Sequence, residues 1–160
     1  MDAHEAGSRG ETDLSPSDYR RLAEVRYQIR RFVRFSEEAA RAAGIEPQQH
    51  QLLLAVKGMP DGRSATIGDV AERLQIQHHS AVELIDRLAD RGLVRRERVE
   101  SDRRQVQLHL TASGDAMLRD LSRHHLDELQ SAGPALMAAL EALIGDGRAN
   151  SNDACAQTLS

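Results

Sequence analysis

The spacing of apolar residues changes at Gly92, and this change constrains the fold more than any other feature of the chain. Before Gly92, apolar residues recur every three or four positions, the repeat of a helix with one buried face. After it, Val106, Leu108 and Leu110 alternate with polar residues, the repeat of a β-strand with one buried face. The sequence therefore predicts helices that lead directly into a β-hairpin.

Two short helices are expected immediately before this hairpin. Thr66 and Asp69 have the spacing of a helix N-cap and its acidic partner. After a turn at 75–77, a second helix ends at Gly92, the residue type that most readily adopts the left-handed conformation of a helix stop. Its four inward apolar residues are Ala81, Leu84, Ile85 and Leu88.

The order helix, tight turn, helix, hairpin is that of a winged helix-turn-helix, whose second helix enters the major groove of DNA. A local excess of positive charge accompanies it. Positions 87–104 hold seven arginines and four acidic residues, a net charge of +3, in a chain whose formal charge is −4. Arginine neutralises phosphates and forms paired hydrogen bonds to guanine. The sequence therefore predicts a partner in double-stranded DNA.

Longer helices are expected on both sides of this lobe. Residues 17–43 carry apolar side chains at helical spacing, and residues 112–145 do so in two helices divided at Pro134. They offer more apolar surface than a winged lobe of ~60 residues buries, and a symmetric pair of chains is the commonest way to cover it. We expect a mostly α-helical homodimer; packing of these helices within one chain is the alternative.

Several segments together resemble the MarR family of bacterial transcription regulators. These segments are 66–74, 79–88, 92–96, 102–104 and 108–114. The resemblance covers residues 15–145 and implies a winged DNA-binding lobe over 47–111, with dimerisation helices over 17–43 and 112–145. It also implies a sequence-specific regulator, most often a repressor, that binds a pseudo-palindromic operator as a homodimer and is released by a small organic effector.

The exposed side of the second short helix supplies the expected contacts to base edges or phosphates. Because the N-terminal half of such a helix faces the bases, these contacts are Gln77, His78, His79 and Ser80. Glu83 departs from the polar or basic residue common in the family. Its carboxylate must accept from a cytosine amino group, pair with an arginine, or face away. For both histidines the alternative is an ordinary solvated helix surface.

The hairpin supplies a second set of expected contacts. The resemblance carries the family's acid-x-Arg wing motif onto Asp102, Arg103 and Arg104, and implies that Asp102 orients an arginine that enters the minor groove. Arg104 stands at the motif position. The negative potential of a narrow A·T groove attracts an arginine at such a place.

Arg87 and Arg96 complete the expected DNA contacts. Arg87 lies on the second short helix near the wing, where the matching arginine of the family contacts phosphate or pairs within the domain. Arg96 lies on the first strand of the hairpin, and we expect it to face opposite to Arg95 and Arg98.

Two other functions stay open as alternatives, a winged-helix module for protein interaction and a metal-responsive regulator. Seven histidines are present, and His124 or His125 with Asp120 or Glu128 has the three- or four-residue spacing of metal ligands on one helix face. Adjacent histidines on one helix do not readily share an ion, so we expect no metal site.

No motif of an enzyme is present. The chain lacks a phosphate-binding glycine loop, a serine nucleophile elbow and a metalloprotease helix, so we expect neither catalysis nor a cofactor. The aromatic content of 2% argues against recognition of single strands by base stacking. A single cysteine, Cys155, and the lack of a run of membrane-spanning length favour the cytoplasm and no membrane partner. We expect residues 1–14 and 146–160 to be disordered tails.

Overall fold

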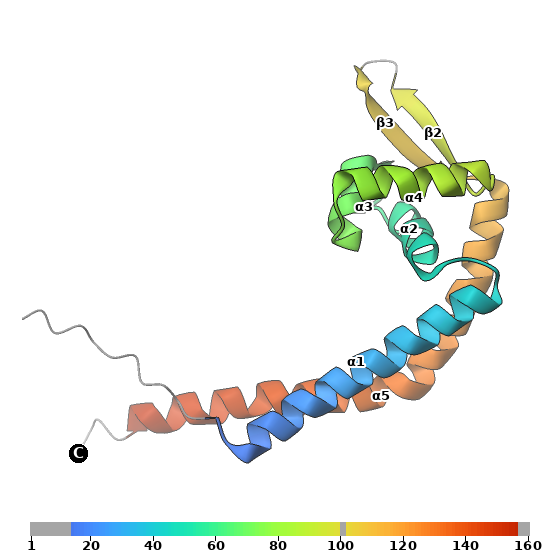
Figure 1. Ribbon diagram of the computed structural model, residues 1–160. Coiled ribbons are helices and arrows are strands. Elements are labelled where there is room, and N and C mark those ends of the chain that lie inside the picture. Colours follow the sequence, from blue (N-terminus) through green and yellow to red (C-terminus); the bar gives the residue numbers. More distant parts are fainter. Residues whose placement is uncertain (1–13, 100–101, 157–160) are drawn as a thin grey trace, which may run out of the picture. The chain divides into compact units, whose positions relative to one another are not determined.

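The computed structural model describes residues 14–99 and 102–156, and the side chains of all of these except 99, 102–105 and 146–156 (Figure 1). Two compact units are present, Met1–Arg31 with Gly133–Ser160, and Phe32–Ala132. The second unit holds the winged lobe. The elements in chain order are α1 (Pro16–Ala42), α2 (Pro47–Lys57), β1 (Ala65–Thr66), α3 (Ile67–Leu74), α4 (His78–Asp90), β2 (Val94–Val99), β3 (Asp102–Leu110) and α5 (Ala112–Ala156).

This order confirms the predicted fold class, a mostly helical chain with a winged helix-turn-helix. The hairpin of β2 and β3 is antiparallel, with Val94 opposite Leu110 at its base and an irregular register between Arg98 and Val99 near its tip. The sheet has the order β1-β3-β2, because the two residues of β1 pair with β3. The sequence did not predict β1, since two residues are too few for an alternating pattern.

The predicted cap of α3 is present in full. The Thr66 hydroxyl accepts from the Asp69 backbone N–H at 3.2 Å, while the Asp69 carboxylate accepts from the Thr66 backbone N–H at 2.9 Å. This reciprocal pair satisfies two backbone donors that the first turn of a helix leaves without partners. At the other end, Gln75 adopts the left-handed conformation with φ 54°, which stops α3 and starts the turn into α4.

The core of the lobe fixes the orientation of α4. Ala81, Leu84, Ile85 and Leu88 are all buried, as predicted, against a core that includes Leu52, Leu53, Val70 and Leu108. Burying one face of α4 in this way leaves its opposite face to solvent.

Glycines set the end of α4 and the start of α5. Gly92 has φ +67°, the left-handed stop predicted from the sequence. The Thr111 hydroxyl donates to the Gly92 carbonyl at 2.6 Å and accepts from the Gly114 backbone N–H at 3.1 Å. Gly114 itself packs so closely that a Cβ there would lie 2.1 Å from the Leu93 carbonyl oxygen. The base of the hairpin is therefore fixed by contacts with the end of α4 and with the first turn of α5.

Helix α5 differs from the prediction. A break at Pro134 and a disordered tail from residue 146 were expected, but α5 is one helix from Ala112 to Ala156 with Pro134 inside it. A proline removes its own backbone hydrogen bond and crowds the preceding turn, which kinks or breaks many helices. Around Pro134 the neighbouring residues include several alanines, the strongest helix former, so the helix continues through it.

The unit made of the first part of α1 and the last part of α5 exposes many large apolar side chains. Val25 and Ala139 are buried in it. Its exposed members are Leu14, Tyr19, Leu22, Tyr27, Ile29, Met137, Leu140 and Ile144. Among the described residues, no helix combines the length and the apolar character that crossing a membrane requires.

Candidate nucleic-acid interface

The first turn of α4 brings together the residues predicted to contact base edges. Gln77 is the N-cap residue, with extended backbone at φ −68° and ψ 149° and no capping hydrogen bond from its side chain. Gln77, His78 and His79 are exposed, and Ser80 is half-buried. The N-terminus of a helix attracts phosphate through its unpaired N–H groups, so these side chains stand where a groove-binding helix meets DNA.

Glu83 pairs with Arg87 one turn further along α4. The Arg87 Nη2 and Glu83 Oε2 atoms lie 3.5 Å apart, and both side chains are about two-thirds exposed. Of the three roles considered for Glu83, pairing with an arginine is the one observed. An exposed pair at this spacing contributes only about 0.3–0.5 kcal/mol, so Arg87 can exchange the carboxylate for a phosphate at little cost.

Arg96 is directed at α4. Its Nη1 lies 2.5 Å from Asp86 Oδ1, and its Nη2 donates to the Val82 carbonyl at 3.5 Å. Arg96 therefore connects β2 to the outward side of α4. The sequence did not identify Asp86 as its partner, since a contact between a helix and a strand depends on the packing of the lobe.

The predicted facing of the hairpin arginines is wrong. Arg96 and Arg98 stand opposite Leu108 and Val106 on β3, so they share a face, while Arg95 stands opposite His109 on the other face. Arg95 pairs there with Glu97 at 2.6 Å. Strand alternation puts residues two apart on the same side, which separates Arg95 from the other two.

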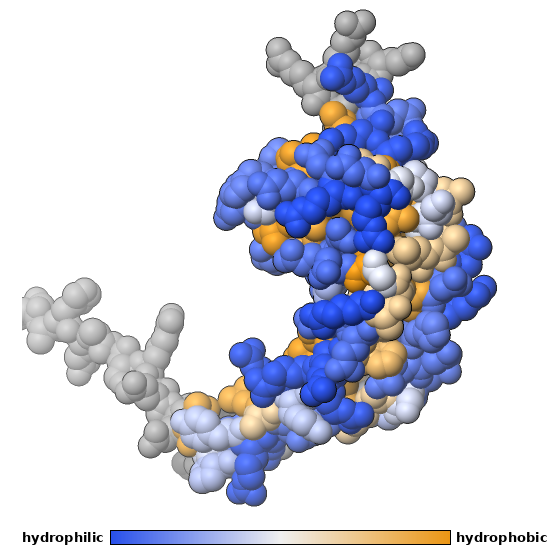
Figure 2. Space-filling model, turned by 45° about the vertical axis from the view of Figure 1, so that its right-hand side comes forward, coloured by the Kyte–Doolittle hydropathy of each residue, from blue (hydrophilic) through white to orange (hydrophobic). Residues whose placement is uncertain are grey.

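The tip of the wing carries the remaining predicted contacts. Strand β3 begins at Asp102, so the acid-x-Arg segment lies at the start of this strand. The side chains of Asp102, Arg103 and Arg104 lie outside the described part of the chain, and their predicted contacts stay predictions. Hydrophilic side chains dominate the visible surface of the lobe near the hairpin (Figure 2).

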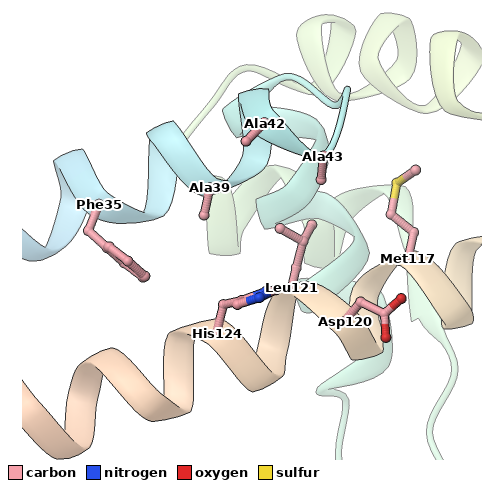
Figure 3. Close-up of a pocket in the computed structure, with 8 residues that line it drawn as sticks. All are labelled: Phe35, Ala39, Ala42, Ala43, Met117, Asp120, Leu121 and His124. Atoms are coloured by element: carbon pink, nitrogen blue, oxygen red, sulfur yellow. The ribbon is translucent and has the colours of Figure 1, made fainter.

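A cavity of about 490 Å³ lies beside α5 in the same unit. In Figure 3, Phe35 and Ala39 of α1 point toward α5, and Leu121 of α5 points back toward α1. The remaining lining residues are Ala42, Ala43, Met117, Asp120 and His124. The lining is mostly apolar with two polar side chains from α5, the composition usual for a site that binds a small organic molecule.

In the same unit, His50 of α2 and His125 of α5 make contacts that connect α1, α2 and α5. The rings of His50 and His125 lie 4.8 Å apart. His125 Nδ1 lies 2.6 Å from the Leu121 carbonyl, which only accepts, so Nδ1 carries a proton. His125 Nε2 lies 2.7 Å from the Ser36 hydroxyl. Burial, and secondarily His125, lower the pKa of His50, so His50 is neutral at pH 7.

The histidines do not assemble a metal site within the described residues. No group of three or more His, Cys, Asp or Glu side chains in that part of the chain is arranged to hold an ion. Asp120 instead pairs with Arg123 at 3.4 Å.

Comparison with known proteins links this arrangement to one family. The model of the MarR family matches residues 43–105, from just before α2 to the start of β3. AbsC of Streptomyces coelicolor, a MarR family transcriptional regulator, superposes with a TM-score of 0.68 at 19% identity, covering 88% of this chain and 98% of AbsC. No curated protein sequence matches the chain with significance.

Two further similar structures are of proteins that bind DNA. The transcriptional repressor CouR, bound to a 23-mer DNA duplex, is 26% identical with a TM-score of 0.59, covering 83% of this chain and 99% of CouR. BpsR of Bordetella bronchiseptica, whose DNA binding is regulated by 6-hydroxynicotinic acid, is 23% identical with a TM-score of 0.58, covering 78% of this chain and 95% of BpsR.

Proposed function

We propose that the chain is a MarR family regulator of transcription, a sequence-specific repressor that binds double-stranded DNA. The family model that matches residues 43–105 and the fold shared with AbsC support this proposal. The observation that carries the proposal is the exposed first turn of α4. Its buried face anchors the helix in the lobe, while Gln77, His78 and His79 are free to reach base edges beside the wing. The DNA complex of the similar repressor CouR supports the same role here.

A gel-shift assay with the DNA upstream of the protein's own gene tests this role. We expect a discrete complex that unlabelled specific DNA removes and random DNA of equal length does not. His79→Ala should weaken the specific complex, while Gln130→Ala, at an exposed polar residue of α5 outside the cavity lining, should leave it unchanged. Binding of a protein partner in place of any DNA would favour the interaction-module alternative and contradict the proposal.

The proposed regulator acts as a homodimer. Within the unit of Met1–Arg31 and Gly133–Ser160, Ile29 and Leu140 are exposed at 43% and 37%, and Met137 and Ile144 at 61% and 62%. Exposed apolar surface of this kind is costly in water, and a second copy of the chain is the commonest way to cover it. Light scattering should give twice the mass of one chain, and Leu140→Asp should lower it, because a carboxylate disfavours burial.

The cavity lined by Phe35 and Leu121 is the proposed effector site. Its apolar lining suits an organic molecule with an aromatic or aliphatic body, and BpsR supports effector control in a protein of this fold. Ala39→Phe should fill the cavity without disturbing α4. Compounds that raise the melting temperature of the wild type and weaken its DNA complex should therefore have no effect on this variant.

A further inference from the structure

A second cavity, of about 420 Å³, lies at the base of the wing, within the unit Phe32–Ala132. We call it the wing-base cavity. It forms where the end of α2, the approach to β1, the outward face of the hairpin and the first turn of α5 meet, and it shares no lining residue with the cavity beside α5. Its charged and ionisable lining side chains are Lys57, Arg63, Arg95, His109 and Asp115.

The charge of this lining is positive. The lining includes three cationic side chains, Lys57, Arg63 and Arg95, and one carboxylate, Asp115, a net charge of +2. The hydrogen bond from Lys57 is the largest cause of a lowered pKa at Asp115, so this carboxylate stays ionised at pH 7. The carboxylates that pair with Arg63 and Arg95, Asp69 and Glu97, are not among the lining residues, so the cavity wall presents more cationic than anionic groups. Such a concave wall favours an anionic occupant.

Each cation already has a carboxylate partner, but the cationic groups keep N–H donors that an anion can use. Lys57 lies 2.6 Å from Asp115, Arg63 2.5 Å from Asp69, and Arg95 2.6 Å from Glu97. The three cations are 55–61% exposed, and ion pairs this exposed to solvent contribute little to stability. A guanidinium carries five N–H donors, of which the contacts to Asp69 and Glu97 each use one.

His109 supplies the second observation. Its Nε2 is buried and has no hydrogen-bond partner among the described residues. The Glu97 Oε2 atom is 3.5 Å from this nitrogen. A buried polar nitrogen without a hydrogen-bond partner is unfavourable, so a ligand oxygen that accepts from Nε2–H would remove that cost.

We propose that the wing-base cavity binds a small oxyanion, the phosphate or carboxylate group of a free metabolite, held by Lys57, Arg63 and Arg95 with His109 donating from Nε2. This site goes beyond the proposed DNA-binding function. A phosphate of bound DNA is a poorer occupant, because Arg95 and His109 pair near the base of the hairpin. At about 3.3 Å per residue, this pair lies roughly 15 Å along the strand from the tip.

Calorimetric titration of the full-length protein with inorganic phosphate, replacing chloride at constant ionic strength, tests the site. We expect saturable binding with one phosphate per chain. Lys57→Gln and His109→Gln should each weaken it about tenfold, the loss of one charge-assisted hydrogen bond. The matched control is Arg34→Gln, which removes the same charge from a side chain on α1 that is 81% exposed, and it should bind as the wild type does.

Nuclear magnetic resonance of the histidine rings gives a second readout. The His109 signals, identified by their loss in His109→Gln, should shift along the same saturation curve. If phosphate binding does not saturate, or if Arg34→Gln weakens it as much as Lys57→Gln does, phosphate acts only by screening charge, and the proposal is overturned. A fall of about one in the salt slope of DNA binding in Lys57→Gln would identify the occupant as a DNA phosphate and would also overturn it.

Discussion

Arg96 of β2 makes an ion pair with Asp86 of α4, with Nη1 and Oδ1 2.5 Å apart, and so joins the wing to α4. Asp86 is 51% exposed and Arg96 34%. This contact joins the two elements proposed to contact DNA, and it leaves Arg96 less free for a phosphate than its position on the hairpin indicates. We therefore expect Arg96 to act on DNA binding chiefly by positioning.

A double-mutant cycle on DNA affinity checks this role. Arg96→Ala and Asp86→Ala should each weaken operator binding by about 1 kcal/mol, and the double variant should be no weaker than either single one. If Arg96 instead contacts phosphate, Asp86→Ala would strengthen binding, because it removes a competing carboxylate from the interface.

Arg104 at the start of β3 is expected to contribute through the minor groove. Arg104→Ala should weaken operator binding by about 1–3 kcal/mol and reduce its salt dependence, while the mass by light scattering stays that of the dimer. A titration across salt concentrations measures both effects. Unchanged affinity would remove the wing from the mechanism.

Two glycines of α5 should respond in opposite directions to alanine. A Cβ on Gly114 would meet the Leu93 carbonyl oxygen at 2.1 Å, so Gly114→Ala should destabilise the protein by more than about 2 kcal/mol. A Cβ on Gly133 meets nothing within 4 Å, so Gly133→Ala should stabilise it by up to about 1 kcal/mol through helix propensity. Urea unfolding of both variants measures the difference, and equal effects would contradict this packing.

Burial of His50 predicts loss of stability in acid. Its pKa is lowered in the folded protein, so below the ordinary histidine pKa of about 6.5 the unfolded chain binds a proton that the folded chain does not. This contribution to stability is complete above that pH and is lost as the pH falls below it.

The comparison of unfolding free energies between pH 5 and pH 8 tests the His50 prediction. The free energy of unfolding should change less with pH in His50→Gln than in the wild type. His124→Gln, which changes an exposed histidine on α5, should keep the wild-type profile. The same slope in all three proteins would show that His50 is not the group responsible.

Local patterns predicted most of the lobe. The Thr66 cap, the inward face of α4 and the stop at Gly92 follow from residue type and spacing alone, and all three are present. Contacts between elements did not follow in this way. The pairs Arg96 with Asp86 and His50 with His125 join residues from different elements, whose meeting depends on how the lobe packs. The continuity of α5 through Pro134 depends on whether the helix propensity of the neighbouring alanines outweighs the backbone hydrogen bond that Pro134 lacks. Spacing alone does not decide this.

Selection of bound fragments from random double-stranded DNA tests the central claim most directly. A homodimer that presents two copies of α4 should enrich a pseudo-palindrome whose half-sites lie about one helical turn, 10–10.5 base pairs, apart. His79→Ala should alter the preferred bases within each half-site and keep the spacing. Recovery of fragments with no common sequence would contradict the account, because it would leave α4 without a role in reading DNA.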